Sequence, residues 1–88
     1  MVCKRVYYSG RVQGVGFRYT AQRLAEDFDV SGCVRNLPGG DVELVAEGPA
    51  DDVAGFLDAV ARRMAGCIER TTVQEEAPSG YKDFRIRY

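Results

Sequence analysis

The chain of 88 residues contains no histidine, and this absence excludes several kinds of site. A catalytic cysteine needs an activating base nearby, and no histidine is present to serve as one. The three cysteines, Cys3, Cys33 and Cys67, lie far apart and show no Cys-x-x-Cys spacing. We therefore expect reduced, mostly buried thiols and no metal centre. A disulfide between two of them is left open, because pairing depends on distances in the fold.

The sequence also lacks long apolar runs and an excess of either charge. No run is apolar for more than a few residues, so we expect no transmembrane span. The N-terminal stretch MVCKRVYYSG lacks the apolar core of a signal peptide, which predicts a cytoplasmic protein. Lysine and arginine number 12 against 13 aspartate and glutamate, a balance that argues against a non-specific nucleic-acid binder. We expect no nucleic-acid and no membrane partner, and nothing requires more than a monomer.

No repeat, linker or low-complexity run divides the chain, so residues 1–88 are predicted to form a single domain. Hydrophobic residues make up 45% of it, which is ordinary for a globular protein. A chain of this length buries only about 60–65% of the surface that its unfolded form exposes. It therefore needs an efficient two-layer architecture.

Hydrophobic periodicity predicts alternating strands and helices. We expect strands at residues 4–12 and 30–36, and a half-buried third strand from residue 42 until the break at Gly48-Pro49. A weaker strand is expected at 68–75 and a short one in the closing FRIRY. Helical spacing predicts helices over about 18–28 and 50–64. The segment NLPGGD between the second and third strands has the composition of a hairpin turn.

The resulting order is β-α-β-β-α-β with a small extra strand. Two helices with one apolar face each would cover one face of an antiparallel sheet. We therefore predict an α+β fold, the ferredoxin-like βαββαβ sandwich. This fold supports many unrelated activities, so it does not identify the function.

The stretch GRVQGVGFRYT, residues 10–20, joins the first strand to the first helix. Glycines there let successive backbone N–H groups converge at a helix N-terminus, which suits an anion. Arg18 adds a planar guanidinium that can grip two phosphate oxygens. The other interpretation is a turn that needs glycine, with Arg18 as a surface cation. On the loop alone the two interpretations are about equally good, because short glycine motifs occur often by chance.

Asn36 ends the second predicted strand, just before the hairpin. In this fold the strand end can lie close to the loop, where an amide can hold a water by donating and accepting hydrogen bonds. Its alternative role is local, because asparagine readily starts a turn. Arg11 and Arg35 are lesser candidates, and we expect them to be surface groups.

Taken together, GRVQGVGFR at 10–18 and GCVRNLPGGDVELVAEG at 32–48 closely resemble the acylphosphatase family. The resemblance extends over the second helix and the closing DFRIRY, so it spans essentially the whole chain. It implies a hydrolase that splits the carboxyl–phosphate bond of acyl phosphates into a carboxylate and inorganic phosphate. It also implies that no metal or cofactor takes part.

The resemblance further implies roles for individual residues. Arg18 would be the phosphate-binding arginine and Asn36 the residue that positions the attacking water. The phosphate-binding loop would comprise Gln13, Gly14, Val15, Gly16, Phe17 and Arg18. The carboxylate at the end of the chain, on Tyr88, would help to orient Arg18, unless Tyr88 only packs on the edge strand.

The chemistry fits the absence of histidine. A carboxylate leaving group has a conjugate acid with a pKa of roughly 4, so no general acid is required. The remaining aspartates and glutamates are expected to be solvated surface groups.

The alternative function is a non-catalytic module that binds phosphate or an acyl phosphate such as carbamoyl phosphate. The family's domain also occurs at the N-terminus of a large hydrogenase-maturation protein. Because this chain ends after FRIRY, as free-standing members do, we favour the enzyme. Its physiological acyl phosphate is left open.

Overall fold

The computed structural model describes residues 1–88, and its elements follow the predicted order. They are, along the chain, β1 (Val2–Gly10), α1 (Phe17–Ala25), β2 (Ser31–Asn36), β3 (Val42–Gly48), α2 (Ala50–Arg63), β4 (Ile68–Glu76) and β5 (Phe84–Arg87). This is the βαββαβ order of the ferredoxin-like α+β sandwich with one short strand added. The predicted fold class is confirmed.

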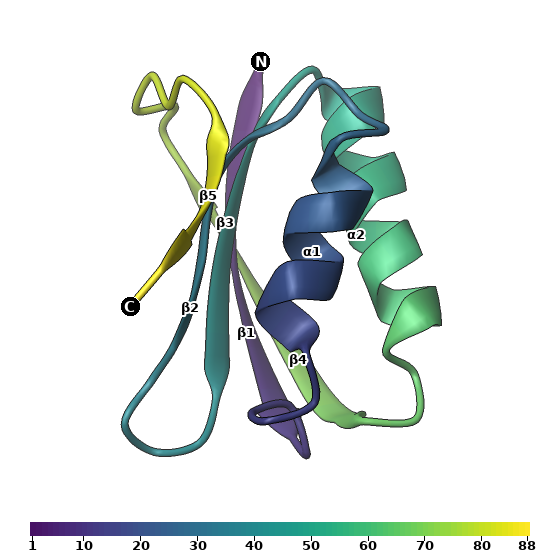
Figure 1. Ribbon diagram of the computed structural model, residues 1–88. Helices are drawn as coiled ribbons and strands as arrows, with labels where there is room; N and C mark the ends of the chain where they lie inside the picture. The colour runs from purple at the N-terminus through teal and green to yellow at the C-terminus, as the bar shows by residue number, and fades with distance from the viewer.

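The strands form one sheet in the order β4-β1-β3-β2-β5, and both helices cover the same face of it (Figure 1). The pairs β1–β3, β1–β4 and β2–β3 are antiparallel, as predicted. β5 differs, because it pairs parallel to β2. The chain leaves β4 at one edge, crosses to the opposite edge and turns back. β5 therefore runs in the same direction as β2, and the sheet is mixed.

The apolar stripe of α2 faces the sheet, as its spacing predicts. Val53, Phe56 and Val60 are fully buried. Burial of one such side chain contributes about 1.5–3 kcal/mol to folding. Asp51 and Asp52 lie in the first turn, where their charges complement the helix dipole. No helix has the length and apolar character needed to cross a membrane.

α1 ends three residues earlier than its hydrophobic period predicts, at Ala25 instead of Phe28. Beyond Ala25 the chain tightens into turns, in which the Phe28 N–H donates to the Ala25 carbonyl at 3.2 Å. Phe28 still reaches the core, with its ring centroid 6.2 Å from that of Phe56. A partly buried side chain thus continues the helical spacing after the helix has ended.

β3 corrects two expectations, because all seven of its residues are buried rather than half of them. Glu43 and Glu47 are only 5% and 4% exposed, so they are not solvated surface groups. β3 is the central strand, and on the helix-free face neighbouring residues cover its carboxylates. Glu43 pairs there with Arg5 of β1 at 3.1 Å and with Arg35 of β2 at 2.6 Å. Arg35 is exposed, as expected of a surface group, and it also pairs with Glu43.

The strand register shows that Cys3 and Cys33 do not form a disulfide. Cys3 in β1 and Cys33 in β2 are both buried, and β3 lies between their strands. Two strand spacings of about 4.8 Å separate such residues by roughly 10 Å, beyond the reach of a disulfide. Cys67 lies just before β4, and all three cysteines are free.

Candidate active site

The loop at residues 11–16 connects β1 to α1 and takes a conformation that requires glycine. Gly14 and Gly16 have φ values of 76° and 78°, in the left-handed region. A Cβ added at either position would meet nothing within 4 Å. The glycines are therefore required by the backbone conformation and not by lack of space. They leave the inner surface of the loop open to a ligand.

The N-terminus of α1 is open to an anion. Gly16 is its N-cap, so no side chain caps the helix, and its first turn contains no acidic residue. The first N–H groups of such a helix have no intrahelical partner and carry the positive end of its dipole. In contrast, the first turn of α2 contains Asp51 and Asp52, whose carboxylates lie where an anion would bind.

A cavity of about 120 Å³ lies at this helix end and brings the predicted loop and Asn36 together. It is lined by Val12, Gly14, Gly16, Phe17, Arg18, Tyr19 and Asn36. Asn36 is the last residue of β2, and β2 enters the sheet two positions from β1. The predicted proximity of Asn36 to the loop is thus confirmed. A backbone-donor cradle, a guanidinium and an amide share one small hollow.

Three other hollows are larger, at about 260, 230 and 190 Å³. The first is bordered by Glu26 and no cation, so it disfavours an anion. The second is bordered by Met1 and Lys82 but also by the carboxylates of Asp29 and Glu47, which oppose an anion there. The third is bordered by Arg23 and Arg63 but lies along the helix flank, where backbone N–H groups are already bonded. The smallest hollow is the one whose chemistry suits phosphate.

Gln13 and Val15 belong to the predicted loop but do not line the cavity. The Gln13 side-chain Nε2 donates to the Leu37 carbonyl at 2.7 Å and to the Asp41 carbonyl at 2.9 Å. Gln13 therefore ties the loop to the hairpin that follows Asn36. Val15 is 42% exposed at the loop surface.

Phe17 anchors the first turn of α1. Its side chain is 2% exposed, and its ring centroid lies 4.9 Å from that of Tyr8 in β1. Tilted aromatic pairs at this distance are favourable beyond the area that they bury. Burial also raises the pKa of the Tyr8 hydroxyl, which keeps it protonated at neutral pH. Phe17 thus fixes the helix end on the sheet and supplies an apolar wall to the cavity.

Arg18 contacts the end of the chain. Its Nη1 donates to the Arg87 carbonyl at 3.2 Å, and its Cζ lies 4.8 Å from the ring centroid of Tyr88. The expected approach of the chain end is therefore present, but a carbonyl and a ring make the contact. The ion pairs of the structure do not include one between Arg18 and the terminal carboxylate. Tyr88 is 91% exposed, so it does not pack on the edge strand.

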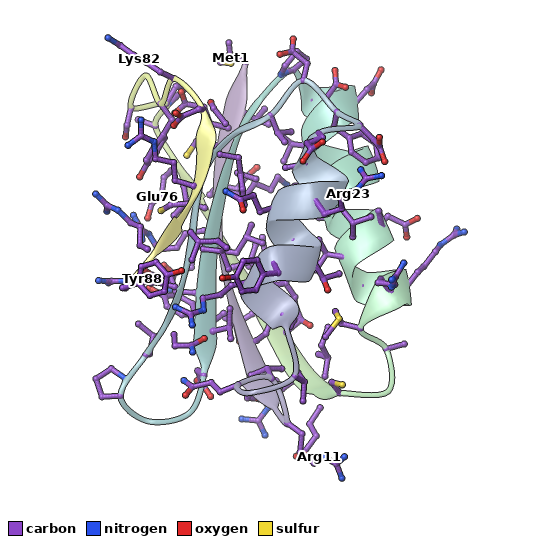
Figure 2. All side chains as sticks on the ribbon, in the orientation of Figure 1. Met1, Arg11, Arg23, Glu76, Lys82 and Tyr88 are labelled. Carbon is purple, nitrogen blue, oxygen red and sulfur yellow. The ribbon has the colours of Figure 1, made fainter.

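Tyr19 is a cavity residue that the sequence analysis missed. It follows Arg18 in the first turn of α1 and is 68% exposed. Its position next to Arg18 was the only available signal. Arg11, by contrast, is exposed and points away from the fold in Figure 2, as expected for a surface cation.

Comparisons with known proteins agree on one family. The acylphosphatase family profile matches residues 4–86. An acylphosphatase of Methanospirillum hungatei is 47% identical over 81 residues, covering 90% of this chain and 89% of that protein. One of Thermotoga maritima is 39% identical, covering 100% of this chain and 99% of that protein.

Solved structures show the same likeness. The crystal structure of acylphosphatase from Bacillus subtilis covers 100% of both chains at 35% identity, with a TM-score of 0.90. Full-length HypF in its phosphate- and nucleotide-bound form matches with a TM-score of 0.82 and 25% identity, but only over 12% of that chain. The family profile and the full-length relatives lead to one conclusion: the chain belongs to the acylphosphatase family.

Proposed function

We propose that this protein hydrolyses acyl phosphates to a carboxylate and inorganic phosphate in the cavity between α1 and the end of β2. The observation that carries the proposal is the joint presence of Arg18, the uncapped α1 N-terminus and Asn36 around one hollow of about 120 Å³. Phosphate oxygens accept hydrogen bonds from the loop and helix N–H groups and from the Arg18 guanidinium. Asn36 holds the attacking water.

The reaction uses no general acid. The water oxygen attacks phosphorus, and the bond from phosphorus to the acyl oxygen breaks with its electron pair leaving on the carboxylate. Because that carboxylate is a weak base, it leaves without being protonated. A non-bridging oxygen of the substrate phosphate takes the proton of the water. Catalysis then rests on positioning and on fixed hydrogen-bond donors, as in other phosphoryl transfers.

A second candidate function is a module that binds phosphate or an acyl phosphate without turnover. The match to 12% of HypF supports it, because there the same fold forms a small part of a much larger chain. The two functions differ in turnover and not in binding.

The test is phosphate release from benzoyl phosphate by the purified protein with a chelator present. We expect turnover that persists in the chelator and is nearly abolished in Arg18→Ala. Arg18 makes a charge-assisted bidentate contact worth about 1.5–3 kcal/mol in binding and more in the transition state. Arg23→Ala is the matched control, because Arg23 lies on the same helix and is 70% exposed at its side chain. Absence of turnover with competitive phosphate binding retained would favour the binding module.

A further inference from the structure

Glu47 is a buried carboxylate that the proposed reaction does not use. It lies on the helix-free face of β3. Its carboxylate accepts hydrogen bonds from three backbone N–H groups of the segment between β4 and β5. The donors are Ser79 at 2.5 Å, Gly80 at 2.9 Å and Tyr81 at 3.1 Å. The hydrogen bond from Ser79, with those from Gly80 and Tyr81, lowers the pKa of Glu47 below its ordinary value. Glu47 is thus a charged anchor for this segment.

The anchored segment, residues 77–83, sets where β5 begins. It crosses between the two edges of the sheet without strand pairing of its own (Figure 1). Besides the three bonds to Glu47, it is held by the Gly32 N–H, which donates to the Asp83 carbonyl at 2.8 Å. Tyr81 also packs on the small cluster of Cys3, Cys33 and Val45.

β5 carries this constraint to Arg18. It is a four-residue edge strand that pairs only with β2, and Phe84 and Ile86 pack it against the core. Its last residue, Arg87, accepts the hydrogen bond from Arg18, and Tyr88 places its ring over the same guanidinium. Figure 2 shows Lys82 in the crossing segment and Tyr88 at the opposite end of β5.

We propose that Glu47 is a positioning residue for the phosphate site, acting on Arg18 through the crossing segment and β5. This inference rests on the proposed role of Arg18 in binding phosphate. The Glu47 carboxylate, at the end of β3 away from the cavity, would fix the positions of the Arg87 carbonyl and the Tyr88 ring, which both contact Arg18. Arg18 then meets the substrate already oriented.

The test compares Glu47→Gln with Glu43→Gln. Both remove a buried charge from the same face of β3, but Glu43 pairs with Arg5 and Arg35 and does not contact residues 77–83. In Glu47→Gln we expect the inhibition constant of inorganic phosphate and the KM for benzoyl phosphate to rise about 2- to 30-fold, the range typical of coupling through a packed network. In Glu43→Gln both constants stay within twofold of wild type, although the protein loses stability. Equal changes in both variants would overturn the proposal.

A variant that lacks Arg87 and Tyr88 separates an effect of Glu47 on the position of Arg18 from an effect on the stability of the protein. Without Arg87 and Tyr88, Arg18 has lost both contacts with the chain end. Glu47→Gln in that background should still lower the urea midpoint but should leave the phosphate constant unchanged. A further loss of phosphate affinity there, as large as in the full chain, would contradict the proposal.

Hydrogen exchange tests the same link without catalysis. In Glu47→Gln the amides of residues 84–88 should exchange faster, whereas in Glu43→Gln they should not. Gly80→Ala offers a loop-side variant, because Gly80 has φ of 84° and an added Cβ would meet nothing within 4 Å. It strains the segment while leaving Glu47 in place, and we expect the same faster exchange. Unchanged amide exchange at residues 84–88 in both variants would overturn the proposed link between Glu47 and β5. A wild-type protein without turnover would overturn only the proposed reaction.

Discussion

At the scale of single residues, Arg18 has two kinds of contact that a lysine could not reproduce together. Its guanidinium donates to the Arg87 carbonyl and at the same time lies against the Tyr88 ring. A planar fork can make these contacts and still present donors to a phosphate, whereas an ammonium is a compact point charge. The geometry of the group matters as much as its charge.

Replacing Arg18 by lysine tests this point. We expect Arg18→Lys to retain a positive charge but to bind phosphate roughly tenfold more weakly, because the bidentate contact is lost. Competitive inhibition of benzoyl phosphate hydrolysis by inorganic phosphate measures the change. An Arg18→Lys variant with wild-type phosphate affinity would show that only the charge is needed.

Asn36 is expected to act on the rate and not on phosphate binding. In Asn36→Ala we predict that kcat falls roughly 10²-fold, as when a positioning donor is removed from other active sites. The inhibition constant of phosphate should stay near that of wild type, since the loop and Arg18 are intact. Steady-state kinetics with phosphate as inhibitor gives both values. Weaker phosphate binding with an unchanged kcat would reverse the assigned role.

These residue roles differ in how far they could be predicted from the sequence. The placement of Gly14, Gly16 and Arg18 at the start of α1 was predictable from the change of hydrophobic period after the first strand, whereas their role in binding phosphate stays a prediction. Asn36 was predictable once the strand order brought it to the same end. The side-chain role of Gln13 was not, because its acceptors are backbone carbonyls of a hairpin 24 and 28 residues away. Such acceptors become available only after the loop and the hairpin have packed.

At the scale of elements, the site depends on two loops held together. The loop at 11–16 and the hairpin at 37–41 are joined by the two hydrogen bonds of Gln13. The hairpin is also closed by the Leu37 N–H, which donates to the Asp41 carbonyl at 2.8 Å. Gln13 thus ties the loop at 11–16 to the hairpin that follows Asn36.

Removing the Gln13 side chain should therefore loosen the hairpin. For Gln13→Ala we expect a loss of about 1–3 kcal/mol in stability, from two hydrogen bonds of about 0.5–1.5 kcal/mol each. We also expect a kcat that falls while phosphate affinity is kept, because Asn36 loses its fixed position. Gln22→Ala is the control, since Gln22 lies on α1 away from the cavity. Urea unfolding and kinetics on both variants test the expectation, which fails if the two behave alike.

The position of β3 as a strand was predictable from the sequence, but the burial of both its faces was not. Alternation of Val42, Leu44 and Ala46 with acidic residues is typical of a strand with one solvated face. The structure buries both faces, because Arg5 and Arg35 pair with Glu43 and the segment after β4 covers Glu47. Such pairing across strands is set by register, which local sequence does not specify.

At the scale of the whole molecule, two buried carboxylates make folding depend on pH. Burial opposes the charge of Glu43, but hydrogen bonds from Arg35 and Tyr7 and the nearby arginine charges outweigh it and lower its pKa. The pKa of Glu47 is lowered as well, chiefly by the hydrogen bond from Ser79. Both groups therefore stabilise the fold as carboxylates.

Stability should fall as the solution is acidified. Below the ordinary glutamate pKa of 4.5, the unfolded chain binds more protons than the folded one, so the free energy of unfolding decreases as pH falls through the folded pKa values. Glu43→Gln should be less stable than wild type at pH 7 and should lose less on acidification. Urea midpoints between pH 7 and pH 3 give both slopes. Equal slopes in the two proteins would show that Glu43 titrates normally.

Isotope labelling distinguishes attack of water on phosphorus, with Asn36 holding that water in the cavity, from attack on the carbonyl carbon. Benzoyl phosphate is hydrolysed by the wild-type protein in water enriched in oxygen-18, and the products are examined by mass spectrometry. We expect the label to enter inorganic phosphate and the benzoate to stay unlabelled, because the bond between phosphorus and the acyl oxygen breaks. Label in the benzoate would mean that water attacks the carbonyl carbon, and it would contradict the roles given to Arg18 and Asn36.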